Sequence, residues 1–313
     1  MTTHIHTFQA MNTQVEVCLE HDSSPLTASA FQEAQALFVQ VEAVCSRFIP
    51  ESELSCLNAQ PAGHIRVVSP LLFEILQAAK QYYKETQGIF HPGILPNLLA
   101  AGYRVSFDLL QHRYDCDHCA DSQPSLESLV PGRLPLPGML PYEIIDSTER
   151  LVQVATPHAI DLSGIAKGWC ADRAAELLAS TGCGYVNAGG DLRLFGQKGS
   201  MWKIGIEDPF YPERNKAILH LTQGAAATSS TWKRRWRVGQ DIRHHLIDPR
   251  TGMPSKSSIV SATVMAPSAI QADIFAKTLL ILGEEEGSDW IEAHKLQALV
   301  ILSNKECRRV GVS

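Results

Sequence analysis

The segment YVNAGGDLRLFG, residues 185–196, decides the fold class, because it is the first of several strand-like runs joined by short connections. Such a succession predicts a largely antiparallel sheet. Glycines inside a strand mark a bulge or a close backbone approach, so Gly189 and Gly190 are expected to face a neighbouring strand or a ligand. The series continues through WKIGIED (202–208), KAILHLT (216–222), GAAATSS (224–230) and SIVSATVMA (258–266).

A few long helices are predicted beside these strands. Apolar residues recur at helical spacing over 31–47, and Ser69-Pro70 reads as an N-cap followed by proline at the first helical position. A third helix is expected over about 167–180. A fourth is opened by the S-x-x-Q pattern at Ser268 and ends at Gly283. Long runs of strands with a few long helices favour an α+β fold over strict βαβ alternation.

Composition and charge exclude some classes of protein. The chain has 313 residues, 45% hydrophobic and 19% charged, which is typical of a soluble globular protein with a core. The net charge of -6 does not favour a nucleic-acid partner, and the basic run WKRRWR (232–237) is better interpreted as a solvated hairpin face. No apolar run approaches the ~20 residues that a membrane span needs. The N-terminal residues lack an export signal, so we expect a cytoplasmic protein with reduced cysteines.

A lone CxxC pair, Cys116 and Cys119, lies near His112 and His118 within a polar stretch. A zinc site there would need a complete ligand set from one loop. Because a second CxxC pair is missing, a polar surface loop is the favoured interpretation.

Two helical segments carry charged residues at positions that could be chemical. Asp161 and Lys167 flank the start of the helix in DLSGIAKGWCADRAAELL (161–178), and backbone N–H groups with a lysine at a helix start are suited to phosphate. An ordinary helix N-terminus has the same pattern. Asp273 and Lys277 lie at i,i+4 spacing, which is typical of a surface ion pair. Their helix is otherwise almost wholly apolar, which favours a functional role.

The segment DIRHHLIDPRTG (241–252) places two histidines before a turn. Either His244 or His245 is a structural imidazole with satisfied hydrogen bonds, or one of the two performs proton chemistry. The residues alone leave both interpretations open.

Together these segments resemble the ApbE-like family, the FAD:protein FMN transferases. The similarity is collinear over nearly the whole chain, which implies one ApbE-like, T-fold-like domain over 1–313 with largely antiparallel sheets packed against long helices. Residues 104–141 are polar and then rich in Pro and Gly, which indicates a long connection, either a domain boundary or a loop insertion at about 104–141 within one domain. Each motif is weakly specific, whereas the ordered set is highly specific. The motifs are AMNT (10–13), CSRFIPESELSCLN (45–58), GIFHPGILPNLLAAGY (88–103), DLSGIAKGWCAD (161–172), VNAGGD (186–191), ATSS (227–230), HHLIDPRTG (244–252) and AD…AK…LG (272–283).

The resemblance implies a reaction and two partners. Such enzymes split FAD at its pyrophosphate, place FMN on a Thr or Ser hydroxyl of an acceptor flavoprotein, and release AMP. Positioning and charge stabilisation dominate phosphoryl-type transfer, and Mg²⁺ would supply part of that charge. The acceptor is expected to carry a motif resembling Asp-x-x-Thr/Ser-Gly-Ala-Thr/Ser.

The resemblance also implies roles for individual residues. His245 would be the base that accepts the hydroxyl proton, whereas His244 is left structural. The carbonyl oxygen of Gly164 and the carboxylate of Asp273 would bind the metal. FAD would be contacted by Met11, Phe48, Ile89, Phe90, His91, Asp161, Lys167 and, through its backbone, Leu246.

This chain departs from the family pattern at several positions. His91 replaces a common Asp, and Asn12 and Ser230 replace glycines. Lys277 replaces the metal-site Thr, and a charged ammonium cannot ligate a cation. Three consequences are open: Lys277 points away from the metal, it supplies positive charge directly to the pyrophosphate, or it pairs with Asp273 and abolishes the metal site.

Two other functions fit the same residues. One is a non-catalytic FAD-binding module. The other is a metal-dependent FAD pyrophosphatase, which would release FMN and AMP without an acceptor. Transferase and pyrophosphatase need the same pyrophosphate site, so only the fate of the flavin separates them.

Overall fold

The structure is a computed structural model that describes residues 2–21, 25–110 and 139–312. The chain forms two compact units, each assembled from separate segments. The first unit comprises Met1–Glu42, Gly164–Ser230 and Ser257–Ser313, and the second comprises Ala43–Ser163 and Thr231–Lys256. The single domain expected over 1–313 stays a prediction, because one domain can contain two compact units.

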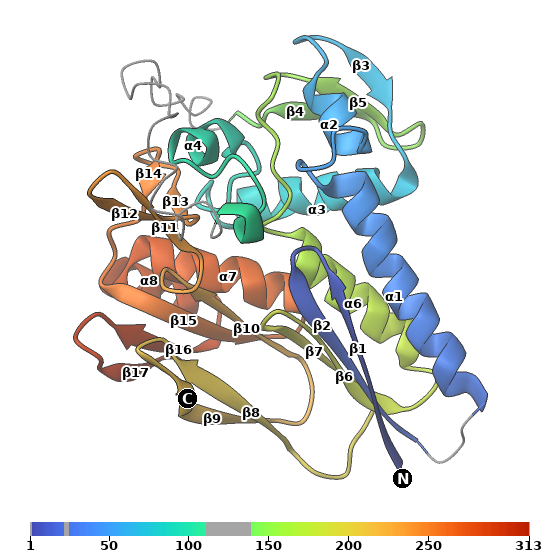
Figure 1. Cartoon of the computed structure of the whole chain (residues 1–313), viewed down its shortest axis with the longest axis vertical. Helices are drawn as coiled ribbons and strands as arrows, with labels where there is room; N and C mark the ends of the chain where they lie inside the picture. Colours follow the sequence, from blue (N-terminus) through green and yellow to red (C-terminus); the bar gives the residue numbers. More distant parts are fainter. Residues whose placement is uncertain (1, 22–24, 111–138, 313) are drawn as a thin grey trace. The chain divides into compact units, whose positions relative to one another are not determined.

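An eight-stranded sheet forms the centre of the first unit (Figure 1). Every pair of neighbouring strands is antiparallel, which confirms the predicted largely antiparallel arrangement. In sheet order the strands are β1 (Thr2–Ala10), β2 (Thr13–His21), β6 (Cys183–Ala188), β7 (Asp191–Phe195), β10 (Ala225–Ser230), β15 (Ile259–Ala266), β16 (Gln297–Leu302) and β17 (Cys307–Gly311).

Four helices accompany this sheet: α1 (Pro25–Cys45), α6 (Ala166–Leu178), α7 (Ala269–Leu282) and α8 (Glu284–Ala293). The boundary between the units falls within α1, after Glu42. Helix α7 is apolar on most sides and therefore buried. It begins after the N-cap Ser268, which accepts a hydrogen bond from the Gln271 N–H at 3.3 Å, and it ends at Gly283 with φ +88°, as predicted.

Helices α6 and α7 approach each other closely. A Cβ atom on Gly168 would lie 2.8 Å from the Cα of Ile270, so only glycine fits there. Asp172 of α6 accepts the N–H groups of Ala269 (2.8 Å) and Ile270 (2.9 Å), which lack partners within α7. The first turn of α7 is thereby held against α6.

The strands β8 (Trp202–Asp208) and β9 (Tyr211–Leu221) pair with each other and stay outside the main sheet. Their apolar side chains, including Ile206 and Leu219, pack on Ala226, Val260 and Ile301 of the sheet. Figure 1 shows this hairpin on the side of the sheet away from α7. Strand β7 consequently pairs directly with β10, which follows the hairpin in the chain.

The second unit contains smaller sheets and the helices α2, α3 and α4. Its core includes Leu98, Tyr103, Phe107, Trp236 and Ile247. Its sheets are β3-β5-β4, β11-β12 and β13-β14. The elements are α2 (Glu53–Asn58), β3 (Ile65–Val67), α3 (Pro70–Glu85), α4 (Leu95–Ala100), β4 (Tyr142–Asp146), β5 (Leu151–Val154), β11 (Arg235–Val238), β12 (Asp241–His244), β13 (Ile247–Asp248) and β14 (Met253–Pro254).

The CxxC pair at Cys116 and Cys119, and most of the insertion expected at about 104–141, lie outside the described residues. Among the helices that are described, none is long and apolar enough to cross a membrane.

Candidate functional site

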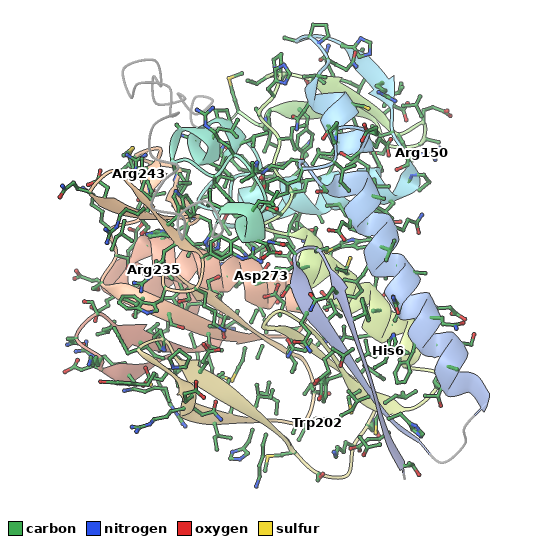
Figure 2. The ribbon with its side chains drawn as sticks, in the orientation of Figure 1. His6, Arg150, Trp202, Arg235, Arg243 and Asp273 are labelled. Atoms are coloured by element: carbon green, nitrogen blue, oxygen red, sulfur yellow. The ribbon has the colours of Figure 1, made fainter. Side chains whose placement is uncertain are left out.

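Four charged side chains of the first unit form a buried cluster. Lys167, in the first turn of α6, pairs with Asp191, the first residue of β7. Lys277 pairs with Asp273, one turn earlier on α7. The pairs are close enough to act on each other, because the charge of Asp273 affects Asp191 and that of Lys167 affects Lys277. The structure thus brings the predicted residues Lys167 and Asp273 together; Figure 2 labels Asp273.

Burial dominates the electrostatics of this cluster. It raises the pKa of Asp191, an effect to which the negative charge of Asp273 adds and which Lys167 opposes. Burial likewise lowers the pKa of Lys277, and Asp273 opposes this shift. One atom stays unsatisfied: Asp273 Oδ2 is buried and has no hydrogen-bond partner in the described part of the chain.

The cluster does not fit a divalent cation. Its two carboxylates and two ammoniums sum to zero charge, and this sum holds even if a proton moves within a pair. A second cation on the carboxylate that already holds Lys277 would face strong repulsion in a buried environment. Elsewhere among the described residues, no group of three His, Cys, Asp or Glu side chains is arranged to hold a metal. Gly164, the other expected ligand, lies in the turn before α6.

Met11 occupies a strained turn of the first unit. Met11 (φ +52°) and Asn12 (φ +57°) are the two residues between β1 and β2, a geometry that favours glycine or asparagine. Asn12 therefore replaces the family's glycine at little cost, whereas Met11 is unusual. Gly189 lies beside this hairpin, because a Cβ atom there would be 2.2 Å from Thr13 Oγ1. The predicted close approach is thus to a neighbouring strand.

In the second unit Asp161 anchors Arg47. Asp161 Oδ2 lies 2.7 Å from Arg47 Nε, and Oδ1 accepts hydrogen bonds from the N–H of Ser163 (2.8 Å) and from its hydroxyl. The guanidinium lies 4.0 Å from the ring centroid of Phe48 and 4.9 Å from that of Tyr103. The predicted residues Phe48 and Asp161 are therefore joined through Arg47.

His91, which stands where family members commonly have Asp, makes the kind of hydrogen bond that two aspartates of this chain make. Its Nδ1 accepts the Gly93 N–H at 2.9 Å, as Asp161 accepts the Ser163 N–H and Asp248 the Arg250 N–H. Burial lowers the pKa of His91 to about 4, so the ring is neutral and Nε2 carries the hydrogen. Phe90 is also buried, and Ile89 is partly buried. The side chains of Phe90 and His91 therefore pack in the interior and support this segment.

His244 and His245 have different surroundings. His244 uses both nitrogens: Nε2 donates to the Ser255 carbonyl at 3.0 Å, and Nδ1 accepts the Leu246 N–H at 3.3 Å. Burial lowers its pKa, as expected of a structural imidazole. His245 is half-buried, and its Nδ1 donates a long hydrogen bond of 3.4 Å to the Arg234 carbonyl. The Leu246 carbonyl accepts the Ser255 N–H at 2.9 Å, so both backbone groups of Leu246 are used within this unit.

Sequence reasoning assigned no role to Arg47, Tyr103 or Asp191. Arg47 and Asp191 stand inside the motifs CSRF and VNAGGD, and their position there was the available signal. Tyr103 is the last residue of the motif GIFHPGILPNLLAAGY, but its contact was not readable from the sequence, because its carbonyl accepts from Arg47 Nη2 at 2.9 Å across a long sequence separation.

The basic run forms the predicted hairpin. Lys233, Arg235 and Arg237 are exposed, and the Arg235 guanidinium lies 3.9 Å from the Trp232 ring centroid. Trp236 points the other way and donates from Nε1 to the Ala101 carbonyl at 2.8 Å. Figure 2 labels Arg235 and Arg243 on this hairpin.

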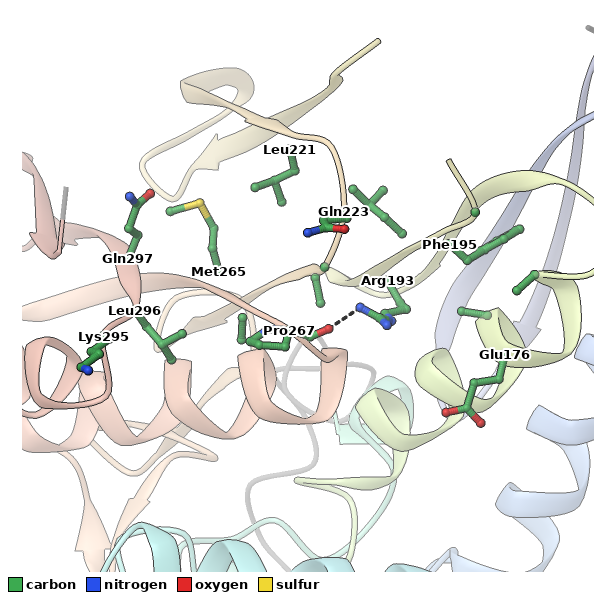
Figure 3. A pocket seen from close by; sticks show the side chains of 17 residues that line it. Glu176, Arg193, Phe195, Leu221, Gln223, Met265, Pro267, Lys295, Leu296 and Gln297 are labelled. Carbon is green, nitrogen blue, oxygen red and sulfur yellow. Dashed lines mark hydrogen bonds between the residues drawn. The ribbon is translucent and has the colours of Figure 1, made fainter. Parts of the chain in front are cut away.

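A groove of 680 Å³ lies elsewhere in the first unit (Figure 3). Glu176, Arg193, Met265 and Lys295 are among its lining residues. Arg193 hydrogen-bonds the Pro267 carbonyl and lies 3.3 Å from Asp172, so its charge is already engaged. None of the predicted site residues lines this groove.

Comparisons with known proteins agree with the motifs. The model of the ApbE family matches residues 11–300. A protein of Vibrio cholerae named FAD:protein FMN transferase is 36% identical over 152 residues, or 47% of this chain and 46% of that protein. A Klebsiella pneumoniae protein of the same name is 25% identical over 295 residues, or 90% of this chain and 87% of that protein. The crystal structure of the ApbE protein of Thermotoga maritima has a TM-score of 0.84 at 23% identity and covers 99% of this chain and 97% of that chain.

The two sequence relatives are named for one class of enzyme, the flavin transferases. Because the family model covers nearly the whole chain, including segments of both units, this chain belongs to the ApbE family. The similarity to the Thermotoga maritima structure confirms the α+β fold.

Proposed function

We propose that this enzyme transfers FMN from FAD to a Thr or Ser hydroxyl of an acceptor flavoprotein and releases AMP. The bond that breaks joins the FMN phosphorus to the oxygen that bridges to AMP. The bond that forms joins this phosphorus to the acceptor's hydroxyl oxygen, so the bridging oxygen leaves on AMP. The hydroxyl proton passes to His245. The family match and the names of the relatives support FAD as donor.

The orientation of His245 is the observation that carries this chemistry. A carbonyl oxygen only accepts hydrogen bonds, so the contact with Arg234 requires the hydrogen on Nδ1. In the neutral ring, Nε2 then has the lone pair that a general base needs. In His244 the nitrogen without hydrogen, Nδ1, already accepts the Leu246 N–H, so His244 is assigned a structural role.

We propose the remaining residues in the roles that the family resemblance implies. In the second unit Phe48 would contact the flavin nucleotide, with Asp161 acting through Arg47, which it anchors. Ile89, Phe90, His91 and Leu246 would shape the FAD-binding segments. In the first unit Met11 and Lys167 would contact FAD. No step passes through Mg²⁺, because the cluster at Asp273 does not fit a divalent cation.

Two finer features stay predictions. The acceptor is expected to carry the motif resembling Asp-x-x-Thr/Ser-Gly-Ala-Thr/Ser, and the enzyme is expected to act in the cytoplasm. A peptide with this motif is therefore the natural substrate for a test.

The experiment follows AMP by chromatography after purified protein is mixed with FAD and Mg²⁺, with and without the acceptor peptide. We expect AMP only with peptide, together with a peptide mass raised by FMN. His245→Ala should lower kcat by about 10²–10⁴-fold and leave FAD affinity unchanged. His220→Ala, at an exposed position on β9, is the matched control.

Other outcomes would favour the alternatives. AMP without a labelled peptide would indicate a pyrophosphatase. Bound FAD without AMP would indicate a binding module. Full activity of His245→Ala would reject the base assignment.

A further inference from the structure

Lys277 stands where a metal ligand is expected, and its ammonium lies on the expected metal-binding carboxylate. Lys277 Nζ pairs with Asp273 Oδ1 and also contacts the Asp273 carbonyl at 3.4 Å. This geometry excludes one of the three consequences of the substitution. Lys277 does not point away from Asp273. Either it has abolished the metal site, or it supplies the positive charge that the cation would have given to the pyrophosphate.

A contribution to folding stability does not explain why this buried ion pair is present. The side chains of Asp273 and Lys277 are 3% and 16% exposed, on a helix whose other residues are mostly buried and apolar. Buried ion pairs contribute little net stability, because desolvation offsets their attraction, and apolar side chains of similar size do as well or better. We therefore infer that the buried pair at this position has a role other than stabilising the fold.

The pair is also incompletely satisfied. An ammonium has three N–H donors, and the only acceptors of Lys277 among the described residues are atoms of Asp273. Among the same described residues, Asp273 Oδ2 is buried without a hydrogen-bond partner. An N–H donor and an acceptor oxygen thus remain for a ligand, and Lys167, a second ammonium, acts on the same cluster.

We propose that the Lys277 ammonium, positioned by Asp273, takes the place of the divalent cation and supplies its positive charge to the FAD pyrophosphate. Transfer then needs no Mg²⁺. This inference rests on the proposed function. It leaves the bonds made and broken unchanged, because Lys277 donates hydrogen bonds to phosphate oxygens and exchanges no atoms with them.

The first test measures metal binding and needs no activity. Free Mn²⁺ is titrated with protein and followed by electron paramagnetic resonance, for the wild type and for Lys277→Thr. We expect no Mn²⁺ site in the wild type and one site per chain in the variant. A site already present in the wild type, or none gained by a folded variant, would overturn the inference. The wild-type titration decides alone if the variant does not fold.

The second test measures transfer to the acceptor peptide after metal removal with EDTA. The wild type should keep its kcat within about twofold, whereas Lys277→Ala should lose at least about 10²-fold. Lys277→Arg should retain part of the rate because it keeps a positive charge. Lys203→Ala, at an exposed lysine of β8, should change nothing.

Failure of this inference and failure of the proposed function would give different results. Transfer only after Mg²⁺ is added would overturn this inference and leave the proposed function standing. Absence of transfer under every condition would overturn the proposed function, and the Mn²⁺ titration would still decide whether Lys277 occupies the cation position.

Discussion

Arg47 with Asp161 in the second unit, and Lys277 with Asp273 in the first, are both buried ion pairs, but their polar atoms are used differently. Arg47 also donates to the Tyr103 carbonyl and stacks on two rings, and the second oxygen of Asp161 accepts from Ser163. Within the described part of the chain, Asp273 Oδ2 instead has no hydrogen-bond partner, and Lys277 donates only to Asp273. Arg47 Nε and Asp161 Oδ2 also lack a well-aligned hydrogen bond, but these two atoms lie 2.7 Å apart in the ion pair, so each has its counter-charge beside it. A pair whose charged atoms meet partners within the protein holds structure. A pair that leaves atoms open is suited to a ligand.

Replacing both members of each pair by apolar residues should separate these roles most strongly. For Lys277→Met with Asp273→Leu, we expect kcat to fall by at least about 10²-fold. The free energy of unfolding should stay unchanged or rise by about 1–4 kcal/mol. AMP release and urea unfolding measure the two effects. The matched double variant, Arg47→Met with Asp161→Leu, should lose stability, because Tyr103 and Ser163 lose their partners. Similar stability losses in both would break the comparison.

Removing one member of the Arg47–Asp161 pair should have the next largest effect. Asp161→Ala leaves the Arg47 guanidinium buried without its counter-charge, and we expect the free energy of unfolding to fall by about 3–5 kcal/mol. Asp161→Asn should lose less, because its amide oxygen can still accept from Ser163. Thermal unfolding of the two variants gives the difference. Equal losses would mean that the hydrogen bond to Ser163 contributes nothing.

His91 extends the comparison to a single buried group whose hydrogen bond depends on pH. Its pKa is about 4 in the folded chain and 6.5 ordinarily, so between these values the unfolded chain binds a proton that the folded chain does not. The resulting stability is present above pH 6.5 and is lost as the pH falls towards 4, by about 3 kcal/mol in total. His91→Asn keeps an acceptor for Gly93 and does not titrate. Urea unfolding of both proteins between pH 7 and pH 4.5 should show the wild type alone losing this increment, whereas parallel curves would contradict it.

Substitution of Met11 should have the smallest effect, because it changes backbone strain and removes no charge. Met11→Gly removes a side chain from a left-handed conformation and should stabilise the fold by about 1 kcal/mol. If the side chain contacts FAD, the Kd for FAD should rise at the same time. Asn12→Gly in the same turn should change the stability less and leave the Kd unchanged. A fluorescence titration with FAD measures this, and an unchanged Kd in both variants would remove Met11 from the binding residues.

Local features were readable from the sequence, whereas features that join distant segments were not. The start of α7 at Ser268 and its end at Gly283 depend on neighbouring residues, and so does the i,i+4 spacing of Asp273 and Lys277. The separate β8–β9 hairpin depends on which strands meet, which periodicity does not encode. The contact of Arg47 with Asp161 depends on folding, so only its place in a family motif marked Arg47 in advance.

The strand order of the first unit has a consequence for synthesis on the ribosome. Strand β2 pairs with β6 through Val15–Glu20 and Cys183–Ala188. The β1–β2 hairpin therefore cannot join the sheet until β6 has been translated, and most of the second unit is translated before β6. Strands β15, β16 and β17, which complete one edge of the sheet, are made last. Pairings between distant segments form slowly and expose unpaired strand edges meanwhile. A nascent chain stalled near Lys256 would therefore present the open edge of β10, and we expect it to need a chaperone at that stage.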